Sequence, residues 1–287
     1  MGFWNYSFDY LQFQVLIMKK LLLVFISNLI FFCCEDVVEI PLNDSKEVLI
    51  VDAYINWIKE SNKTEQKVNL SLSSPYFRKT YKPATGANVY IEDKNGKIYQ
   101  FTEENSGYYI PIDTIPYDTK NRYRINIQYK NQNYTGEESL KTVSSINRIE
   151  QESVELFGNE AVQLEAYCLD PIEENNFSYF EFTSAGLEFP EYNIFRDDFT
   201  SGGEYYGFLL DTELKKGDQV RVRQFGLSNF GYNYWYLLIL QNTQQGGPFV
   251  GTPVNLKGNI FNLENSNNYA FGYFRMSEVS EINYVIK

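Results

Sequence analysis

The fold class follows from residues 87–102, ANVYIEDKNGKIYQFT, in which two stretches carrying β-branched and aromatic residues flank a short polar segment. The polar segment is Asp93-Lys94-Asn95-Gly96. An asparagine followed by a glycine favours the left-handed backbone conformations of a hairpin turn. We therefore predict a β-hairpin with strands at 87–92 and 97–102.

The same kind of strand recurs on both sides of this hairpin. Val68, Leu70 and Leu72 alternate with polar residues, and residues 123–129 show the same period of two. Six or seven short strands separated by turns are typical of a β-sandwich. We predict an immunoglobulin-like or transthyretin-like sandwich over 47–143, with strands at 47–55, 68–72, 87–92, 97–102, 123–129 and 134–139.

A second β-rich domain is predicted over 144–287, with one helix near 231–245. Apolar residues recur at helical spacing between Tyr232 and Gln244, with Trp235 and Ile239 on the buried face. Ser228 or Asn229 is a suitable N-cap, and 246–248 (Gly-Gly-Pro) ends the helix. Strands are predicted at 162–169, 177–184, 205–210, 219–225, 269–274 and 282–286.

The composition excludes several classes of function. Among 287 residues 17% are aromatic, which favours β-structure. The net charge of −12 argues against a nucleic-acid-binding protein. The absence of histidine excludes Ser-His-Asp triads and His-ligated metals, and three cysteines exclude a disulfide framework. We expect no cofactor and no metal, and the enzymes that remain use carboxylate pairs, Ser-Lys dyads or oxygen-ligated metals.

The N-terminus resembles a bacterial lipoprotein signal peptide. Met18, Lys19 and Lys20 precede the largely apolar segment 21–32, which ends at Cys33-Cys34. In such signals the cysteine is lipidated and becomes the first mature residue, and we assign this role to Cys34. Residues 1–33 are then an upstream extension and signal peptide, with Met1 and Met18 as alternative starts, and 34–46 are a lipidated tether. The apolar segment is too short to span a bilayer comfortably.

Several segments in a characteristic order resemble the Bacteroidetes lipoprotein family known as domain-of-unknown-function (DUF) family 4249. They are Cys34-Glu35-Asp36, 49–55 (LIVDAYI), 70–77 (LSLSSPYF), 86–89 (GANV), 247–249 (GPF), 258–262 (GNIFN) and 270–274 (AFGYF). The resemblance implies a surface lipoprotein encoded beside a TonB-dependent outer-membrane receptor, with no catalytic residues to carry over. Glu35-Asp36 resembles the acidic signal that sends such lipoproteins to the cell exterior.

Carboxylate-rich segments are the candidate metal or catalytic sites. Asp93-Lys94-Asn95-Gly96 holds the ligands of half a calcium loop but reads more simply as a turn. Asp197-Asp198, followed by 202–204 (Gly-Gly-Glu), is a candidate calcium site or carboxylate pair, and 173–176 is most simply a polar loop.

Aromatic clusters are the candidate ligand platforms, weighed against core packing. They comprise Tyr205, Tyr206 and Phe208, and Phe230, Tyr232, Tyr234 and Trp235. We expect Trp235 to pack in the core, Trp57 to be exposed near a strand end, and Cys168 to be a small buried hydrophobe.

The leading functional hypothesis is a non-enzymatic accessory lipoprotein on the outer membrane, facing the cell exterior. It is attached through its lipid and binds a TonB-dependent receptor, or a glycan or peptide ligand, and it binds no nucleic acid. The alternatives are a surface glycan hydrolase that uses a carboxylate pair, and a structural or adhesive surface protein.

Overall fold

The computed structural model describes residues 18–20, 47–74, 81–171, 176–197, 202–243 and 255–287. Residues 18–20 are helical. Cys34, the tether and the predicted helix stop at 246–248 lie outside the described residues. Residues 46–287 form one compact unit.

This unit is mostly β, as predicted, and its strands form two sheets. The large sheet has thirteen strands in the order β12-β11-β14-β16-β1-β2-β6-β5-β4-β7-β8-β15, with β3 paired to β2, and the small sheet has the order β13-β10-β9. The strands are β1 (Leu49–Ile58), β2 (Thr64–Leu72), β3 (Lys82–Pro83), β4 (Asn88–Asp93), β5 (Ile98–Asn105), β6 (Tyr108–Pro111), β7 (Tyr123–Tyr129), β8 (Gln132–Glu138), β9 (Ile146–Leu156), β10 (Asn159–Leu169), β11 (Phe177–Ser184), β12 (Glu191–Arg196), β13 (Glu204–Asp211), β14 (Gln219–Gly226), β15 (Ile260–Asn262) and β16 (Ala270–Val285).

The predicted hairpin is formed by β4 and β5. Asp93 closes its turn, because its Oδ1 accepts hydrogen bonds from the backbone N–H of Asn95 at 2.8 Å and of Lys97 at 3.0 Å. Gly96 has φ +82°, the left-handed conformation that the sequence predicts there. These bonds explain the Asp93 carboxylate as a turn residue.

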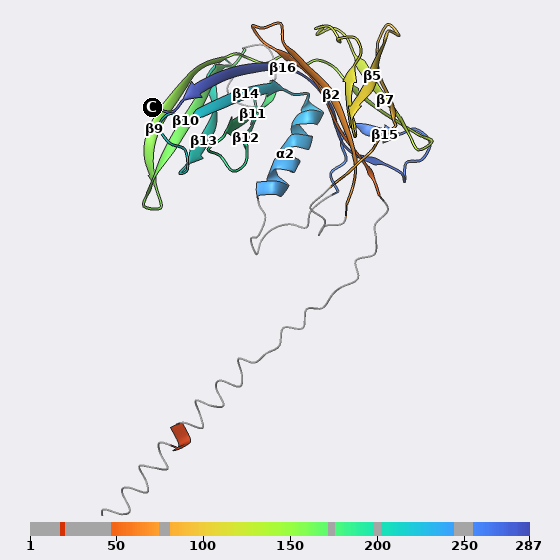
Figure 1. Cartoon of the computed structure of the whole chain (residues 1–287). Coiled ribbons are helices and arrows are strands. Elements are labelled where there is room, and N and C mark those ends of the chain that lie inside the picture. Colours follow the sequence, from red (N-terminus) through yellow and green to blue (C-terminus); the bar gives the residue numbers. More distant parts are fainter. Residues whose placement is uncertain (1–17, 21–46, 75–80, 172–175, 198–201, 244–254) are drawn as a thin grey trace, which may run out of the picture. The chain divides into compact units, whose positions relative to one another are not determined.

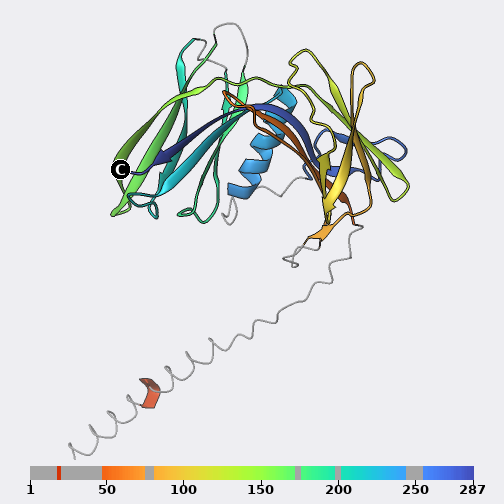
Figure 2. The same ribbon diagram turned by 45° about the horizontal axis from the view of Figure 1, so that its top comes forward.

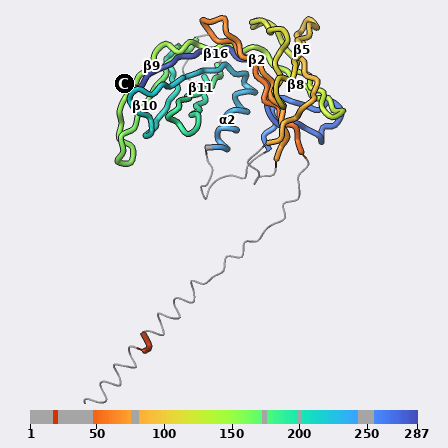
Figure 3. Tube along the Cα trace, in the orientation of Figure 1, coloured from red at the N-terminus to blue at the C-terminus, as the bar shows by residue number. Residues whose placement is uncertain are grey.

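Strand β16 joins the two halves of the unit. It pairs in parallel with β1 along Leu49–Ile58, and its later part pairs antiparallel with β14, from Phe225 opposite Val279 to Gln219 opposite Val285. The sequence predicts two separate strands here, at 269–274 and 282–286, and this is wrong. Polar residues interrupt the apolar pattern between the two predicted strands. The strand continues through them because their side chains form hydrogen bonds: Ser277 Oγ, for example, donates to the carbonyl of Gly226 at 2.7 Å. Figure 3 shows the first strand of the unit and its last lying side by side.

Two large hydrophobic cores lie along this sheet, and a third, smaller cluster of Tyr179, Phe225, Leu227 and Val279 packs against Trp235 of the predicted helix. The first is enclosed where the sheet curls and brings β8 and β15 against β16, and it contains Val51, Ile55 and Phe274. The second lies between the small sheet and strands β11 and β14, where Leu164 and Cys168 face Phe180 and Val222. This second core is a two-sheet sandwich (Figure 2).

The predicted boundary at residue 143 precedes every residue of the second core, but the first core takes Ile260, Phe274 and Met276 from beyond it. Strands β1, β14 and β16 also carry one sheet across it, within a single compact unit. The independence of the two predicted domains, 47–143 and 144–287, stays a prediction.

The predicted helix is α2 (Asn229–Thr243), which lies beneath the arch formed by β14 and β16 and contacts β11 and β12 (Figure 1). Ser228 is its N-cap, as expected: its Oγ accepts a hydrogen bond from the N–H of Gly231 at 3.1 Å, and its carbonyl accepts from Tyr232 at 2.8 Å. The side chains of Trp235 and Ile239 are half-buried.

Candidate functional site

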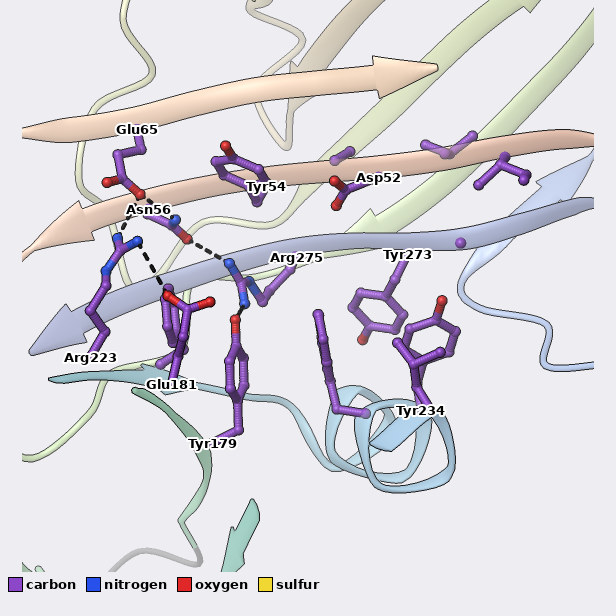
Figure 4. Close-up of a pocket in the computed structure, with 17 residues that line it drawn as sticks. Asp52, Tyr54, Asn56, Glu65, Tyr179, Glu181, Arg223, Tyr234, Tyr273 and Arg275 are labelled. Atoms are coloured by element: carbon purple, nitrogen blue, oxygen red, sulfur yellow. Dashed lines mark hydrogen bonds and ion pairs between the residues drawn. The ribbon is translucent and has the colours of Figure 1, made fainter. Parts of the chain in front are cut away.

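A cavity of about 370 Å³ lies between helix α2 and the large sheet. Strands β1, β2 and β16 form its floor. Its walls are one face of α2 and the parts of β11 and β14 that carry Tyr179 and Phe225 (Figure 4). The volume falls in the range of small-molecule sites, roughly 300–1,000 Å³.

The alternation of the two central strands gives this cavity a polar floor. On β1, Val51, Ala53 and Ile55 point into the first core, so Asp52, Tyr54 and Asn56 point to the opposite face. On β16, Phe274 and Met276 enter the same core, and Tyr273 and Arg275 face the cavity. The parallel register places Tyr54 beside Arg275 and Asp52 beside Tyr273.

Gly272 permits the close approach of β1 and β16 at the edge of this floor. Its φ is +102°, and a Cβ there would lie 1.9 Å from the carbonyl oxygen of Val51. Only glycine meets both conditions without distortion.

Arg275 is buried in the floor, and no described carboxylate forms an ion pair with it. It is 7% exposed. Its Nη1 donates to the hydroxyl of Tyr179 and its Nη2 donates to Asn56 Oδ1 at 3.2 Å, whereas Nε has no hydrogen-bond partner in the described part of the chain. None of the ion pairs among described residues includes Arg275. Burying a charged guanidinium among neutral groups removes its hydration and lowers the stability of the fold. An apolar side chain at this position would avoid that cost.

Aromatic rings surround this cation. The Arg275 guanidinium carbon lies 4.5 Å from the ring centre of Phe225, 5.2 Å from that of Tyr179 and 5.7 Å from that of Trp235. The three rings are stacked, with centres 4.5 Å apart between Phe225 and Tyr179 and 4.8 Å apart between Tyr179 and Trp235. Cation–π attraction offsets part of the desolvation cost and leaves the net charge in place.

Arg223, the other buried arginine of this face, is neutralised. Its Nη2 lies 2.6 Å from Glu65 Oε2, and its Nε lies 3.4 Å from Glu281 Oε2. Burial alone would raise the pKa of Glu65, but the hydrogen bonds from Arg223 and Asn56 hold that pKa below its ordinary value. This arginine is a structural ion-pair centre.

Asp52 is the carboxylate that remains free in the cavity. Solvent reaches its side chain, and it makes no hydrogen bond or ion pair with the described residues. The surrounding protein raises its pKa, and Arg275 and Lys67 oppose this rise in part. Burial, together with the charge of Asp52, also raises the pKa of Tyr234 to about 12.

The structure divides the predicted aromatic platforms. Trp235 packs on the sheet through the ring of Tyr179, and Trp235 and Tyr234 also line the cavity, so a ligand-platform role for them stays a prediction. Tyr205 is buried in the second core, whereas Tyr206, Phe208 and Phe230 are exposed. The expectation that Trp57 is exposed is wrong: β1 extends to Ile58, and Trp57 faces the first core at 6% exposure. Cys168 is fully buried, as expected, and its Sγ donates to Gln224 Oε1 at 3.0 Å.

The predicted carboxylate sites do not assemble into a metal-binding group within the described ranges. Glu204 accepts hydrogen bonds from Arg148, and Asp198 and 173–175 lie outside the described residues. In the part of the chain that the structure describes, no helix is both long and apolar enough to cross a bilayer.

Arg275, Asp52 and Tyr179 were missed by the sequence reasoning. The only signal available was a lone arginine inside the otherwise apolar stretch Tyr273-Phe274-Arg275-Met276. Their proximity depends on the pairing of β16 with β1 and on the stacking of β11 against α2, which local patterns do not contain.

A family model described as domain of unknown function DUF4249 matches residues 35–283. The chain belongs to the DUF4249 family. The resemblance of the quoted segments is thereby confirmed, and the cavity residues of this DUF4249 chain all lie within the matched range. No curated protein matches the chain. Among solved structures, a two-domain fibronectin type III segment from chicken tenascin matches with 12% identity, over 65% of this chain and 93% of that chain, at a TM-score of 0.21, and this likeness is too slight to carry an argument.

Proposed function

We propose that this chain is a non-enzymatic lipoprotein that binds a small ligand in the cavity under α2. The observation that supports this is Arg275, a buried cation that no described carboxylate pairs with, in an aromatic-walled cavity of about 370 Å³. Destabilising groups of this kind collect at functional sites, because a binding site is kept for its ligand and not for the stability of the fold.

The carboxylates of the cavity favour binding over hydrolysis. Glu65 is paired with Arg223, and Glu181 lies 3.9 Å from the same guanidinium, which leaves Asp52 as the one free carboxylate of the lining. Glycoside hydrolysis uses two carboxyl groups in separate roles.

The cellular setting of the proposal comes from the sequence. Lipid at Cys34 anchors the chain to the outer membrane, facing the cell exterior, where it delivers its ligand to a TonB-dependent receptor. The support for this part is the signal-peptide pattern of 18–34 and the family resemblance.

A ligand screen with two matched helix variants tests the binding function. The full chain in phospholipid nanodiscs is screened against a library of small metabolites by ligand-detected NMR. Leu238→Trp fills the cavity from α2, while Leu237→Trp changes an exposed neighbour on the same helix. We expect hits that disappear in Leu238→Trp and persist in Leu237→Trp. A screen in which every hit survives Leu238→Trp contradicts the proposal.

A further inference from the structure

The N–H donors of the cavity exceed the acceptors that the described residues supply to them. Of the five N–H groups of an arginine, Arg275 directs one to Tyr179 and one to Asn56. Its Nε and the Nε1 of Trp235 are both buried without a partner in the described part of the chain. Buried donors are normally paired. The Nε atoms of Arg221 and Arg223 are also without a hydrogen-bond partner in that part of the chain, but carboxylates neutralise both of those guanidiniums. Arg275 combines an unpaired donor with a charge that no ion pair among the described residues neutralises, and this combination indicates a missing anionic acceptor.

We propose that the cavity recognises the carboxylate of an aromatic or apolar acid, and that Arg275 receives this carboxylate. The inference rests on the proposed function, namely that the cavity is a binding site. A planar guanidinium matches the geometry of a carboxylate and forms charge-assisted hydrogen bonds with it. The nearby protein carboxylates Glu65 and Glu281 are already committed to Arg223 and Arg221.

The rest of the cavity indicates the body of this ligand. Trp235 and Leu238 from α2 and the ring of Tyr179 form an apolar wall beside the guanidinium. A flat apolar or aromatic group packs well against such a wall. Figure 4 shows Arg275 between Tyr179 and the polar groups of β1, so the carboxylate end and the apolar end of the ligand have separate environments.

Asp52 should weaken the binding of a ligand carboxylate. It is a free carboxylate on the floor, and it interacts electrostatically with Arg275. Its negative charge repels a ligand carboxylate, so Asp52→Asn strengthens the binding of a simple acid. A ligand that carries an amine as well as a carboxylate would respond in the opposite direction.

Matched probe pairs test the inference. Phenylacetate is compared with phenylacetamide, and indole-3-acetate with indole-3-acetamide, on the full chain in nanodiscs by ligand-detected NMR titration. We expect each carboxylate to bind at least about tenfold more tightly than its amide, the preference that one charge-assisted hydrogen bond provides. Arg275→Met should remove this preference, and Asp52→Asn should strengthen both carboxylates without strengthening the amides.

The outcomes separate this inference from the proposed function. Equal binding of acid and amide, lost in Leu238→Trp, overturns the carboxylate inference and leaves the binding function standing. Absence of binding by both carboxylates, or a preference that survives Arg275→Met, also overturns the inference. Binding that is unaffected by Leu238→Trp places the probes elsewhere and counts against both proposals. If Arg275→Met does not fold, two milder variants test the same preference for the carboxylate over the amide. Arg275→Lys keeps the charge but loses the planar guanidinium, so it should reduce the preference. Asp52→Asn removes a repulsion, so it should increase the preference.

Discussion

Arg275 on β16 donates a hydrogen bond to the hydroxyl of Tyr179 on β11, a residue 96 positions earlier in the chain. Tyr179 is itself clamped between Phe225 and Trp235. The guanidinium is therefore held in place by a neutral stack of rings, while its charge takes part in no ion pair among the described residues. A pre-organised anion-binding site requires a cation that is held in a fixed geometry and is not already neutralised by a protein carboxylate.

Asp52→Asn should make the protein more stable at neutral and alkaline pH. Because the folded-state pKa of Asp52 is raised above 3.8, its ionised form is disfavoured by folding. The wild-type chain therefore loses stability as the pH rises through this raised pKa, and the Asn variant does not. Below pH 3.8 the carboxyl is protonated in both folded and unfolded states, and the advantage disappears.

Urea unfolding of the two proteins across this pH range measures the difference. Glu104→Gln, a change at an exposed carboxylate, serves as the control. A variant less stable than wild type at pH 8 would show that the attraction of Arg275 outweighs burial at this position.

Trp235→Ala should reduce the free energy of unfolding by about 2–3 kcal/mol, less than the ~3–5 kcal/mol of a fully buried tryptophan, because the side chain is half-buried. It should also weaken ligand binding, since the ring lines the cavity. Tyr236→Ala, at an exposed position of the same helix, should change stability by about 0.5 kcal/mol or less. Equal effects of the two changes in urea unfolding would refute the stacking role of Trp235.

Gly272→Ala should destabilise the chain by about 3 kcal/mol or more, because a Cβ there combines a left-handed φ with a clash against the backbone of β1. Gly158→Ala is the matched control. It also has a positive φ, +81°, but nothing lies within 4 Å of the added Cβ, so it should cost only the backbone strain of about 1 kcal/mol. Thermal unfolding of both variants tests this, and a Gly272→Ala variant as stable as Gly158→Ala would contradict the close approach.

Cys34→Ala should release the protein from membranes, because the predicted lipid is its only proposed anchor. Cys33→Ala should remain membrane-bound. Fractionation of cells grown with a radiolabelled fatty acid measures both effects. Label that still enters the Cys34→Ala protein would exclude this cysteine as the lipidation site.

The alternation of apolar and polar residues made most of the strands predictable. Strands without an apolar face and a polar face could not be predicted in this way. The strands at 123–129 and 177–184 match β7 and β11 in their bounds. Strand β9, at the edge of the small sheet, was missed because its INRIEQESVEL sequence is largely polar and exposed on both faces. The helix was predictable from its spacing and cap.

The candidate site was much less predictable than the fold. Trp235 and Tyr234 were recognised as aromatic candidates, but Arg275 and Asp52 carry no motif, and their chemistry depends on which groups are absent around them. That information appears only when β1, β11, β16 and α2 are assembled.

If Arg275 is kept for a ligand and not for the fold, its removal should cost far less stability than the removal of Arg223. Both arginines are buried on the same face, at 7% and 8% exposure, but of the two only Arg223 forms ion pairs with carboxylates in the described ranges. Urea unfolding of Arg275→Met and Arg223→Met, without ligand, measures what each charge does for stability.

Arg223→Met should lose roughly 2–3 kcal/mol, because among the described residues it leaves Arg221 as the one cation paired with Glu65 and Glu281. Arg275→Met should change stability by no more than about 1 kcal/mol, because the desolvation of an unpaired charge is relieved as its hydrogen bonds are lost. A loss from Arg275→Met as large as that from Arg223→Met would show that Arg275 is a structural residue and is not kept for a ligand.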